Sequence, residues 1–439
     1  MSSAQGTQVR TTSDWKTPFF TIWIGQAFSW LGSMLVHFAL IWWLTRSTGS
    51  ATVLASASLV GMLPGIILGP MAGACVDRWD RRRVMIVADG LIALATLVLA
   101  GLFWSGAVRI WHVYAILFVR SVAGTFHWPA MQASTSLMVP KEQLSRVAGM
   151  NQLVGGAFNV VAPTLGAILI SALPIQGVLG IDVVTAALAI TPLFFVAVPQ
   201  PPRSVAASRD AGRSSLLADL GQGLRYVWSW PGLLAVIFMA AIINLLLNPA
   251  YSLLPLLVTK RFNGQAQELG WMNSAQGLGI VAGGLLLSTW GGFRRRAFTG
   301  MTGLVGMGLS TLLLGVAPES AFWAAVASIA VGGLSNPIAN GPLLAIFQSA
   351  VEPEMQGRVF TLLGALTSGL SPLGMAIAGP VADALGVQSW FIIGGLVCLL
   401  MGLAGFFWPA IVHLEDGRGA QGQLPHGALA ADTSIVTEV

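Results

Sequence analysis

Gly73-Ala-Cys-Val-Asp77-Arg78-Trp-Asp80-Arg81-Arg82-Arg83 is a burst of six charged residues between two long apolar stretches. Among the sixty residues that precede Asp77, Arg46 is the only Lys, Arg, Asp or Glu. A charged side chain at the centre of a bilayer costs roughly 2.5 to 3.5 kcal/mol on insertion scales, so a cluster this dense belongs in water. The stretch therefore predicts a short loop just beyond the end of a membrane-spanning helix.

The composition predicts an all-α membrane protein. The chain has 439 residues, of which 55% are hydrophobic and 9% charged, whereas an average soluble domain is roughly 25% charged. Apolar runs recur at the length of about 20 residues that crosses the hydrocarbon core. Dividing these runs at Gly and Pro turns predicts twelve spans, at 19–44, 51–76, 84–104, 110–138, 147–172, 177–198, 233–258, 269–291, 297–316, 321–349, 359–384 and 388–412.

The cysteines and the first apolar run exclude several other classes. Cys75 and Cys398 fall in separate spans, so neither a disulfide framework nor a cysteine metal site is available, and no metal or other cofactor is expected. The first apolar run is too long for a signal peptide and lacks a cleavage site after a short core, which predicts an uncleaved first helix. No Gly-x-x-x-x-Gly-Lys-Ser/Thr loop occurs, so nucleotide hydrolysis is not expected.

The positive charges predict the orientation. Of 22 Lys and Arg residues, four lie in outer turns (Arg46, Arg109, Lys260 and Arg261) and Arg120 lies within a span, which leaves seventeen on the side of the N-terminus. Short cytoplasmic loops carry such an excess, so both termini are expected in the cytoplasm of a multi-pass protein of the cell (plasma or inner) membrane. The net charge of +5 is therefore explained by cytoplasmic loops beside the lipid bilayer, which is the expected partner, and no binding to nucleic acid is expected.

One long polar segment, 199–232, divides the spans six and six. Leu216, Leu220 and Leu224 recur in it at helical spacing, which fits a helix on the cytoplasmic interface, and a solvated loop fits equally well. The predicted parts are a cytoplasmic N-terminus (1–18), two six-helix bundles (19–198 and 233–412), the linker (199–232) and a disordered cytoplasmic tail (413–439).

The two halves resemble each other. Val139-Pro-Lys-Glu-Gln-Leu-Ser-Arg146 before the fifth span parallels Val351-Glu-Pro-Glu-Met-Gln-Gly-Arg358 before the eleventh, and Gly73 to Arg83 has a reduced counterpart in Gly283 to Arg296. Repeats of six helices about an axis normal to the membrane are how many transporters build a central site. The repeat predicts two bundles that move relative to each other.

These motifs resemble those of the major facilitator superfamily over residues 17–413. Gly73-x-x-x-Asp77-Arg78-x-x-Arg81-Arg82 matches its loop motif, Arg120-x-x-x-Gly124 resembles its fourth-helix motif, and Gly156 to Gly166 partly resembles the fifth-helix motif of its exporters. The sequence around Asp77, with Ile181-Asp182, is similar to sequences of the macrolide-efflux and enterobactin-exporter branch, whose members resemble drug/proton antiporters. The second half departs from the loop motif, because its corresponding turn has Arg294, Arg295 and Arg296 and no acidic residue.

The resemblance implies a cytoplasmic gate in the loop. Carboxylate and guanidinium groups there can pair across the bundles when the cytoplasmic side is shut, which gives roles to Gly73, Asp77, Arg78, Arg81 and Arg82. Upstream, Gly61, Gly65, Gly69 and Gly73 form a stripe of small residues on one helix face. Such a stripe serves static packing or a sliding interface, and the sequence leaves both open.

Spans one and four are expected to line a cavity, as the resemblance implies. Arg120 is the basic residue deepest in a span, and intramembrane ionisable groups mark substrate or ion pathways by default. If Arg120 binds substrate, its replacement by alanine is expected to abolish transport without reducing membrane abundance. Alternatively, Arg120 organises the carboxylates. The other pocket candidates of this half lie on the same helix faces: Gln26, Trp30, Ser33 and His37 in span one, and His127, on the face of Arg120, in span four. For each of the two histidines, the alternative is a hydrogen-bonded packing role.

The second half offers amides at a spacing of four residues. Asn244 and Asn248 lie in span seven, and Asn336 and Asn340 lie in span ten. They point to a polar ligand, or they satisfy carbonyls that Pro249 and Pro337 free. Tyr251 and Trp30 are the favoured pocket aromatics.

Proton coupling needs a group that binds and releases a proton near neutral pH. The candidates are Asp89, Asp182, His37 and His127, with Asp383 at the end of span eleven. For Asp89, we expect a structural pair with the loop arginines in preference to a transport role.

Together these features predict a secondary active transporter that exports an amphipathic small molecule of the drug, macrolide or siderophore class by alternating access, coupled to protons, as a monomer. An importer or uniporter on the same scaffold is the alternative. A membrane enzyme or signalling protein is disfavoured, since the chain has no His-Glu-x-x-His or Gly-x-Ser-x-Gly motif, and no enzymatic activity is expected.

Overall fold

The computed structural model describes residues 15–200 and 224–416, which divide into two compact helical units. Unit 1 comprises the described residues up to Gly49, those of 56–207, and Gln265–Gly270. Unit 2 comprises Ser50–Ala55, the described residues of 208–264, and those from Trp271 onward. Most of the predicted linker lies outside the described residues, and within it residues 224–228 are helical.

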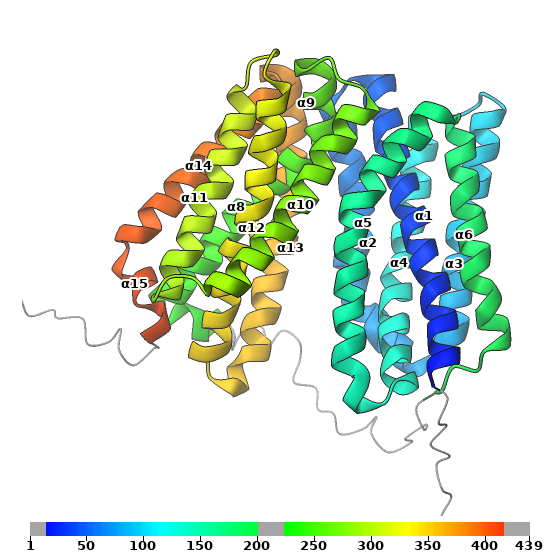
Figure 1. Cartoon of the computed structure of the whole chain (residues 1–439), viewed down its shortest axis with the longest axis horizontal. Coiled ribbons are helices and arrows are strands. Elements are labelled where there is room, and N and C mark those ends of the chain that lie inside the picture. The colour runs from blue at the N-terminus through cyan, green and yellow to red at the C-terminus, as the bar shows by residue number, and fades with distance from the viewer. Residues whose placement is uncertain (1–14, 201–223, 417–439) are drawn as a thin grey trace, which may run out of the picture. The chain divides into compact units, whose positions relative to one another are not determined.

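Unit 1 is a bundle of long helices that run side by side (Figure 1). Its helix α1 begins, and its helix α6 ends, at the lower end of the bundle in that view. The helices are α1 (Lys16–Thr48), α2 (Ala51–Arg78), α3 (Arg81–Trp104), α4 (Ile110–Met138), η1 (Lys141–Gln143), α5 (Leu144–Ala172) and α6 (Ile175–Phe195).

Unit 2 is a second bundle of the same kind. Its elements are α8 (Pro231–Ser252), α9 (Leu254–Arg261), α10 (Ala266–Trp290), α11 (Arg296–Val316), α12 (Phe322–Ala350), α13 (Pro353–Leu385), α14 (Val387–Phe407), α15 (Pro409–Val412) and η2 (Leu414–Asp416). The predicted span 233–258 is corrected here, because the helix breaks after Ser252 and resumes as α9, with Pro255 in its first turn.

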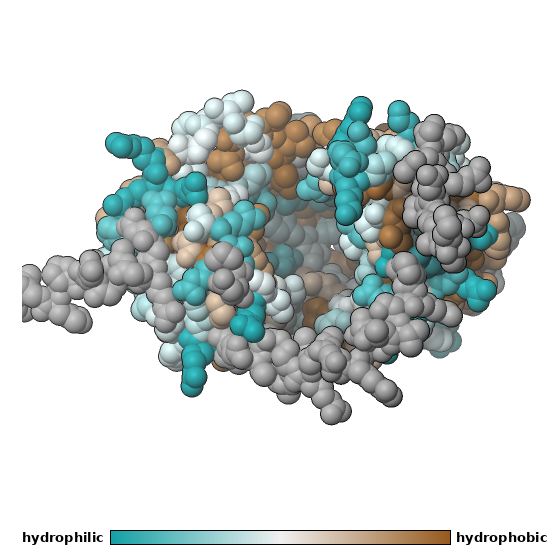
Figure 2. Space-filling model, turned by 90° about the horizontal axis from the view of Figure 1, so that it is seen from below, coloured by the Kyte–Doolittle hydropathy of each residue, from teal (hydrophilic) through white to brown (hydrophobic). Residues whose placement is uncertain are grey.

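The all-helical membrane fold is confirmed. Ten of the described helices are both long and apolar enough to cross a membrane. The helices α4 and α10 do not reach that hydropathy, although they have 29 and 25 residues. The reason in α4 is its Arg120 and His127, which turn toward buried partners instead of lipid. Figure 2 shows hydrophilic side chains gathered on the face seen from below.

Local sequence explains where helices begin and end. Gly49 closes α1 in the left-handed conformation with a φ of 60°, where a side chain is disfavoured. Asp80 caps α3, because its side chain accepts a hydrogen bond from the Arg83 N–H at 3.0 Å. This cap fixes the charged turn between α2 and α3.

Asp383, near the end of α13, caps the first turn of α2 within unit 2. Its carboxylate accepts from the N–H groups of Ala51 and Thr52 at 2.7 and 2.9 Å, and from the Ser50 hydroxyl at 2.9 Å. A carboxylate at a helix N-terminus is stabilising, since it satisfies N–H groups that have no partner in the helix. The contacts give Asp383 a structural role.

Glycines allow close helix contact in unit 2 but not along the stripe of α2. A Cβ added at Gly308 of α11 would lie 2.7 Å from the Leu399 Cα and 2.9 Å from the Cys398 carbonyl carbon in α14. A Cβ added at Gly61, Gly69 or Gly73 would meet no heavy atom within 4 Å. These positions therefore make no close helix contact within unit 1, and a sliding role for the stripe stays a proposal.

We expect Gly308→Ala to destabilise the protein and Gly69→Ala to leave its stability unchanged. The added methyl group at 308 meets backbone, which cannot move aside, and overpacking of this kind costs about 1 to 3 kcal/mol. The melting temperatures of the two purified variants, compared with the unsubstituted protein, test this expectation. Equal melting temperatures for both variants would contradict it, and lower transport by Gly69→Ala at unchanged stability would support a sliding stripe.

Candidate functional site

Arg120 of α4 forms an ion pair with Asp182 of α6 inside unit 1. The guanidinium Nη1 lies 2.6 Å from Asp182 Oδ2, and the side chains are 10% and 0% exposed. The carboxylate is satisfied further by two hydroxyls, since Thr96 donates to Oδ2 at 2.9 Å and Ser33 donates to Oδ1 at 3.3 Å. Arg120 also donates to the Thr96 hydroxyl. Both charges are therefore committed to each other.

Asp89 of α3 is the second buried carboxylate of unit 1, at 3% exposure. Its Oδ2 accepts a hydrogen bond from the Gln26 amide at 2.9 Å, and its Oδ1 lies 3.3 Å from His127 Nε2. The ring nitrogen is within ion-pair distance, yet it is buried and makes no hydrogen bond of good geometry within the described chain. A titratable pair thus lies in the same bundle as the arginine pair.

The predicted pairing of Asp89 with the loop arginines is wrong. Arg81 donates instead to the Ala133 carbonyl at 2.8 Å, and Arg82 donates to the carbonyls of Leu193 and Phe194. Leu193 and Phe194 lie in the last turn of α6, where carbonyls lack helix partners and attract positive charge. Ala133 lies one turn further from the end of α4. The loop arginines hold helix ends and leave Asp89 to α1 and α4.

The two buried pairs form two levels with the same spacing on three helices. Seven residues separate Gln26 from Ser33 in α1, Asp89 from Thr96 in α3, and Arg120 from His127 in α4. Seven residues are two helical turns, or about 10 Å. One level therefore holds Gln26, Asp89 and His127, and the other holds Ser33, Thr96, Arg120 and Asp182. The sequence analysis did not identify Thr96 as a partner of Asp182. Its position seven residues after Asp89, on the same face of α3, could have indicated it.

Trp30 and His37 of α1 do not contact the carboxylates. Trp30 is 38% exposed and packs edge-on against Phe158, with ring centroids 5.4 Å apart. His37 is exposed as well. The predicted face of span one therefore divides between Gln26 and Ser33, which bind Asp89 and Asp182, and two exposed rings.

The predicted gate residues have different surroundings. Asp77 is 74% exposed in its side chain and lies 3.6 Å from Arg81 within the same loop, and Arg78 is exposed. In the corresponding turn of unit 2, Arg295 donates to the Val412 carbonyl at 3.3 Å and the Arg296 N–H donates to Glu415 at 3.0 Å. Asp77 is thus an exposed acidic group, whereas the second turn is tied to the segment after α14.

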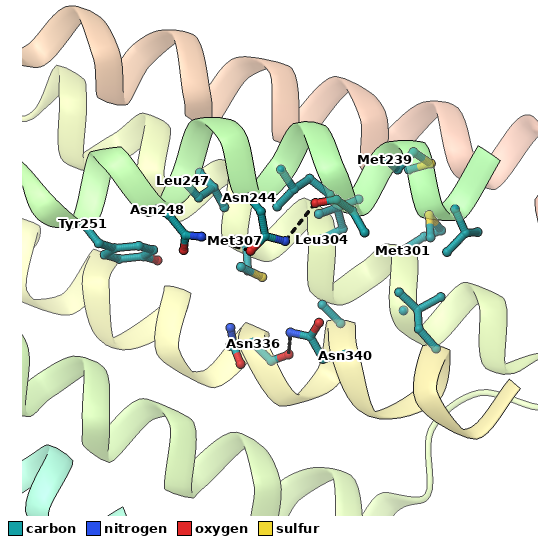
Figure 3. A pocket seen from close by; sticks show the side chains of 16 residues that line it. Met239, Asn244, Leu247, Asn248, Tyr251, Met301, Leu304, Met307, Asn336 and Asn340 are labelled. Atoms are coloured by element: carbon teal, nitrogen blue, oxygen red, sulfur yellow. Dashed lines mark hydrogen bonds between the residues drawn. The ribbon is translucent and has the colours of Figure 1, made fainter. Parts of the chain in front are cut away.

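Unit 2 contains a pocket between α8, α11 and α12. Figure 3 shows Asn244 and Asn248 on α8 opposite Asn336 and Asn340 on α12, and Tyr251 also lines the pocket. The rest of the lining is apolar and rich in methionine: Val236, Met239, Ala240, Ile243, Leu247, Gly300, Met301, Leu304, Met307, Ala339 and Leu343. All five second-half candidates therefore line one cavity.

The asparagine amides do not donate to the carbonyls that the prolines leave without a hydrogen-bond donor. Asn244 donates to the Ala240 carbonyl at 2.8 Å, and Asn340 donates to the Asn336 carbonyl at 3.0 Å. Proline deprives the carbonyl four residues earlier of its partner, so Pro249 and Pro337 would free the carbonyls of residues 245 and 333. The amides bond to other carbonyls, and the alternative that they replace lost helix bonds is wrong.

The pocket has both polar capacity and apolar surface. Asn248 donates to Asn244 at 3.1 Å and to Ser371 at 3.3 Å, while the Asn336 amide makes no hydrogen bond to the described residues. The cavity encloses about 160 Å³, which is less than the roughly 300 to 1,000 Å³ of a site for a whole drug-sized ligand. The cavity therefore suits one part of a larger molecule, a part that has both polar groups and apolar surface.

Comparison with known proteins finds similarity to efflux proteins and to solved transporters. The profile of the transmembrane secretion effector family matches residues 14–430. Macrolide efflux protein A of Streptococcus pyogenes is 35% identical over 389 residues, which cover 88% of this chain and 95% of that protein. The multidrug efflux pump Tap of Mycolicibacterium fortuitum is 28% identical over 416 residues, covering 92% and 98%. A solved bacterial homologue of the lysosomal transporter Spinster shares the fold, with a TM-score of 0.66 at 13% identity, covering 92% of this chain and 99% of that one.

Proposed function

The chain belongs to the transmembrane secretion effector family of the major facilitator superfamily, and on this basis we propose that it exports an amphipathic drug-like molecule of the macrolide class from the cell. Export proceeds by alternating access and is driven by proton entry. The protein works as a monomer in the cell membrane with both termini in the cytoplasm.

The unit 2 pocket is the observation that carries the proposal. Amides at Asn244, Asn248, Asn336 and Asn340 offer donors and acceptors without charge. Methionine side chains around them are flexible and polarizable, so the wall adapts to different apolar shapes. A neutral polar cluster on an adaptable apolar wall fits a molecule that has hydroxyl groups on a large hydrocarbon frame. The names of the efflux relatives support this class of ligand.

Unit 1 contributes two kinds of residue to the proposal. Trp30 and His37 are accessible on α1 and supply an aromatic surface and a polar ring to the substrate. Arg120 organises Asp182 and does not touch the substrate, because its charge is already paired. The ion pair supports the second of the two roles that the sequence leaves open for Arg120.

An accumulation assay tests the function. A drug-sensitive bacterial host that expresses the protein should retain less radiolabelled macrolide than the same host with an empty vector, and a proton uncoupler should remove the difference. Equal accumulation in both hosts, across several macrolides and other amphipathic drugs, would overturn export. The importer or uniporter alternative is tested by counterflow in vesicles with and without a pH gradient, since only a coupled exporter responds to the gradient in the direction of efflux.

Replacement of Asp77 by asparagine should slow turnover and preserve substrate binding. Asp77 forms an ion pair with Arg81 at 3.6 Å, but its side chain is 74% exposed, so another cation can replace Arg81 in another state of the transport cycle. The maximal efflux rate should fall while ligand-induced thermal stabilisation stays unchanged. Glu142→Gln, which removes another exposed carboxylate of unit 1, is the matched control. A Asp77→Asn variant that lost binding but kept its rate would contradict a gating role.

A further inference from the structure

We propose that Asp89 and His127, with Gln26 beside them, form the proton-binding site of this transporter. The inference rests on the proposed proton-driven export and identifies the groups that carry the proton. It also assigns the neighbouring pair, Arg120 and Asp182, a charge that stays constant through the cycle.

The geometry around His127 favours the uptake of one proton. Its Nε2 is buried, lies 3.3 Å from Asp89 Oδ1 and makes no hydrogen bond to the described residues. A proton that binds the ring makes it an imidazolium with a nitrogen 3.3 Å from a carboxylate oxygen, which is within ion-pair distance. The same proton gives the buried Asp89 carboxylate a cation beside it.

Gln26 keeps the site intact when the proton leaves. Its amide donates to Asp89 Oδ2 at 2.9 Å, so the carboxylate has a hydrogen bond whether His127 is charged or neutral. Asp89 is 3% exposed and Gln26 7%, and an unpaired carboxylate in such a place is costly without a donor. The glutamine therefore allows the deprotonated state to exist in the folded protein.

The other buried pair cannot do this chemistry. An arginine guanidinium stays protonated at any physiological pH, so the positive charge beside Asp182 does not depend on pH. The Asp182 carboxylate also accepts from Thr96 and Ser33. The pair fixes the packing of α1, α3, α4 and α6 around the site that titrates.

The remaining charged groups of these helices do not compete for Asp89. Asp182 is the only ionisable residue of α6, and it binds Arg120. Arg81 and Arg82 of α3 bond to main-chain carbonyls. The other ionisable residues on α1, α3 and α4 lie six or more residues along the helix from Gln26, Asp89 or His127: Lys16, His37, Arg46, Arg83, His112 and Tyr114. The remaining ones on the elements from α1 to α6 lie on α2, η1 and α5: Cys75, Asp77, Arg78, Lys141, Glu142 and Arg146.

The proton balance gives one proton for each cycle. With neutral His127 and ionised Asp89 the site has a charge of −1, and a proton from the outer side that binds Nε2 brings it to zero. Release of the same proton to the cytoplasm restores the charge. A buried site of charge −1 is less stable than a neutral one, so loss of the proton favours the state in which water reaches the site. This is the link between the proton and the change of state.

Proton binding can be measured without any substrate. Infrared difference spectra of the purified protein, taken between about pH 5 and pH 8 where histidine titrates, should contain imidazole and carboxylate bands. We expect His127→Gln and Asp89→Asn to lose the bands that these two side chains contribute, while the bands of the other histidines remain. His112→Gln, at the start of the same helix, should lose only the bands of its own ring. Site-variant spectra identical to that of the unsubstituted protein would overturn the proposal.

Vesicle assays separate this proposal from the proposed function. With radiolabelled macrolide, Asp89→Asn and His127→Gln should lose accumulation driven by a pH gradient and keep counterflow at equal pH on both sides. If both variants accumulate drug in response to the gradient as the unsubstituted protein does, the proton site is elsewhere and export stands. If the unsubstituted protein transports no drug at all, export fails, and the infrared experiment alone decides whether Asp89 and His127 bind the proton.

Discussion

Replacing Arg120 by alanine is expected to reduce both the stability and the membrane abundance of the protein. The substitution leaves the fully buried Asp182 carboxyl group without its cation, and breaking a buried ion pair in this way costs about 3 to 5 kcal/mol. A residue that only contacted substrate would instead lose transport at normal abundance. Melting temperature and the amount of protein in isolated membranes distinguish the two outcomes.

A double-mutant cycle makes the expectation for Arg120 sharper. Arg120→Met combined with Asp182→Leu removes both charges, so the pair should recover a large part of the stability that either single substitution loses. Thermal melts of the four proteins give the coupling. Additive losses, or an Arg120→Ala variant as stable and abundant as the unsubstituted protein, would show that the pair does not hold this bundle together.

The fold was predictable because the membrane imposes its pattern in one dimension. The cost of charge in lipid places Asp77 to Arg83 in water, and the width of the bilayer sets the length of each apolar run. The same logic underestimates α4, whose hydropathy is lowered by residues that face protein and not lipid. Hydropathy reports the mean environment of a helix, so it misses a helix with one polar, buried face.

The partners of the buried carboxylates were less accessible from sequence. Asp89 lies two turns from Arg82 in the sequence, and this proximity suggested a pair that does not form. Which neighbour a carboxylate meets depends on how α1, α3 and α4 are rotated about their axes, and a single chain does not report that rotation. The asparagines of unit 2 were easier, because a spacing of four residues already puts two side chains on one helix face.

The two units thus offer different chemistry. Unit 1 has two buried carboxylates, each with a basic partner and hydrogen-bond donors. The pocket of unit 2 is lined by uncharged residues. These compositions support the proposal that unit 1 binds the proton and unit 2 binds the uncharged part of the substrate.

Filling the unit 2 pocket should abolish transport without destabilising the fold. Ala240 lines the cavity from α8 and is partly accessible, so Ala240→Trp projects an indole into a space of about 160 Å³. Tryptophan keeps the helix, since its cost in helix propensity relative to alanine is below about 0.7 kcal/mol. We expect efflux of macrolide to fall to the level of the empty vector, with the melting temperature close to that of the unsubstituted protein.

The matched control for this substitution lies two residues earlier on the same helix. Phe238 is 63% exposed and does not line the pocket, so Phe238→Trp adds the same ring on another face and should transport normally. If Ala240→Trp is as active as Phe238→Trp, the substrate does not enter the cavity and the amides of α8 and α12 have another purpose. If Ala240→Trp binds drug but does not move it, the pocket is needed for the transition between states, and the ligand contacts lie outside it.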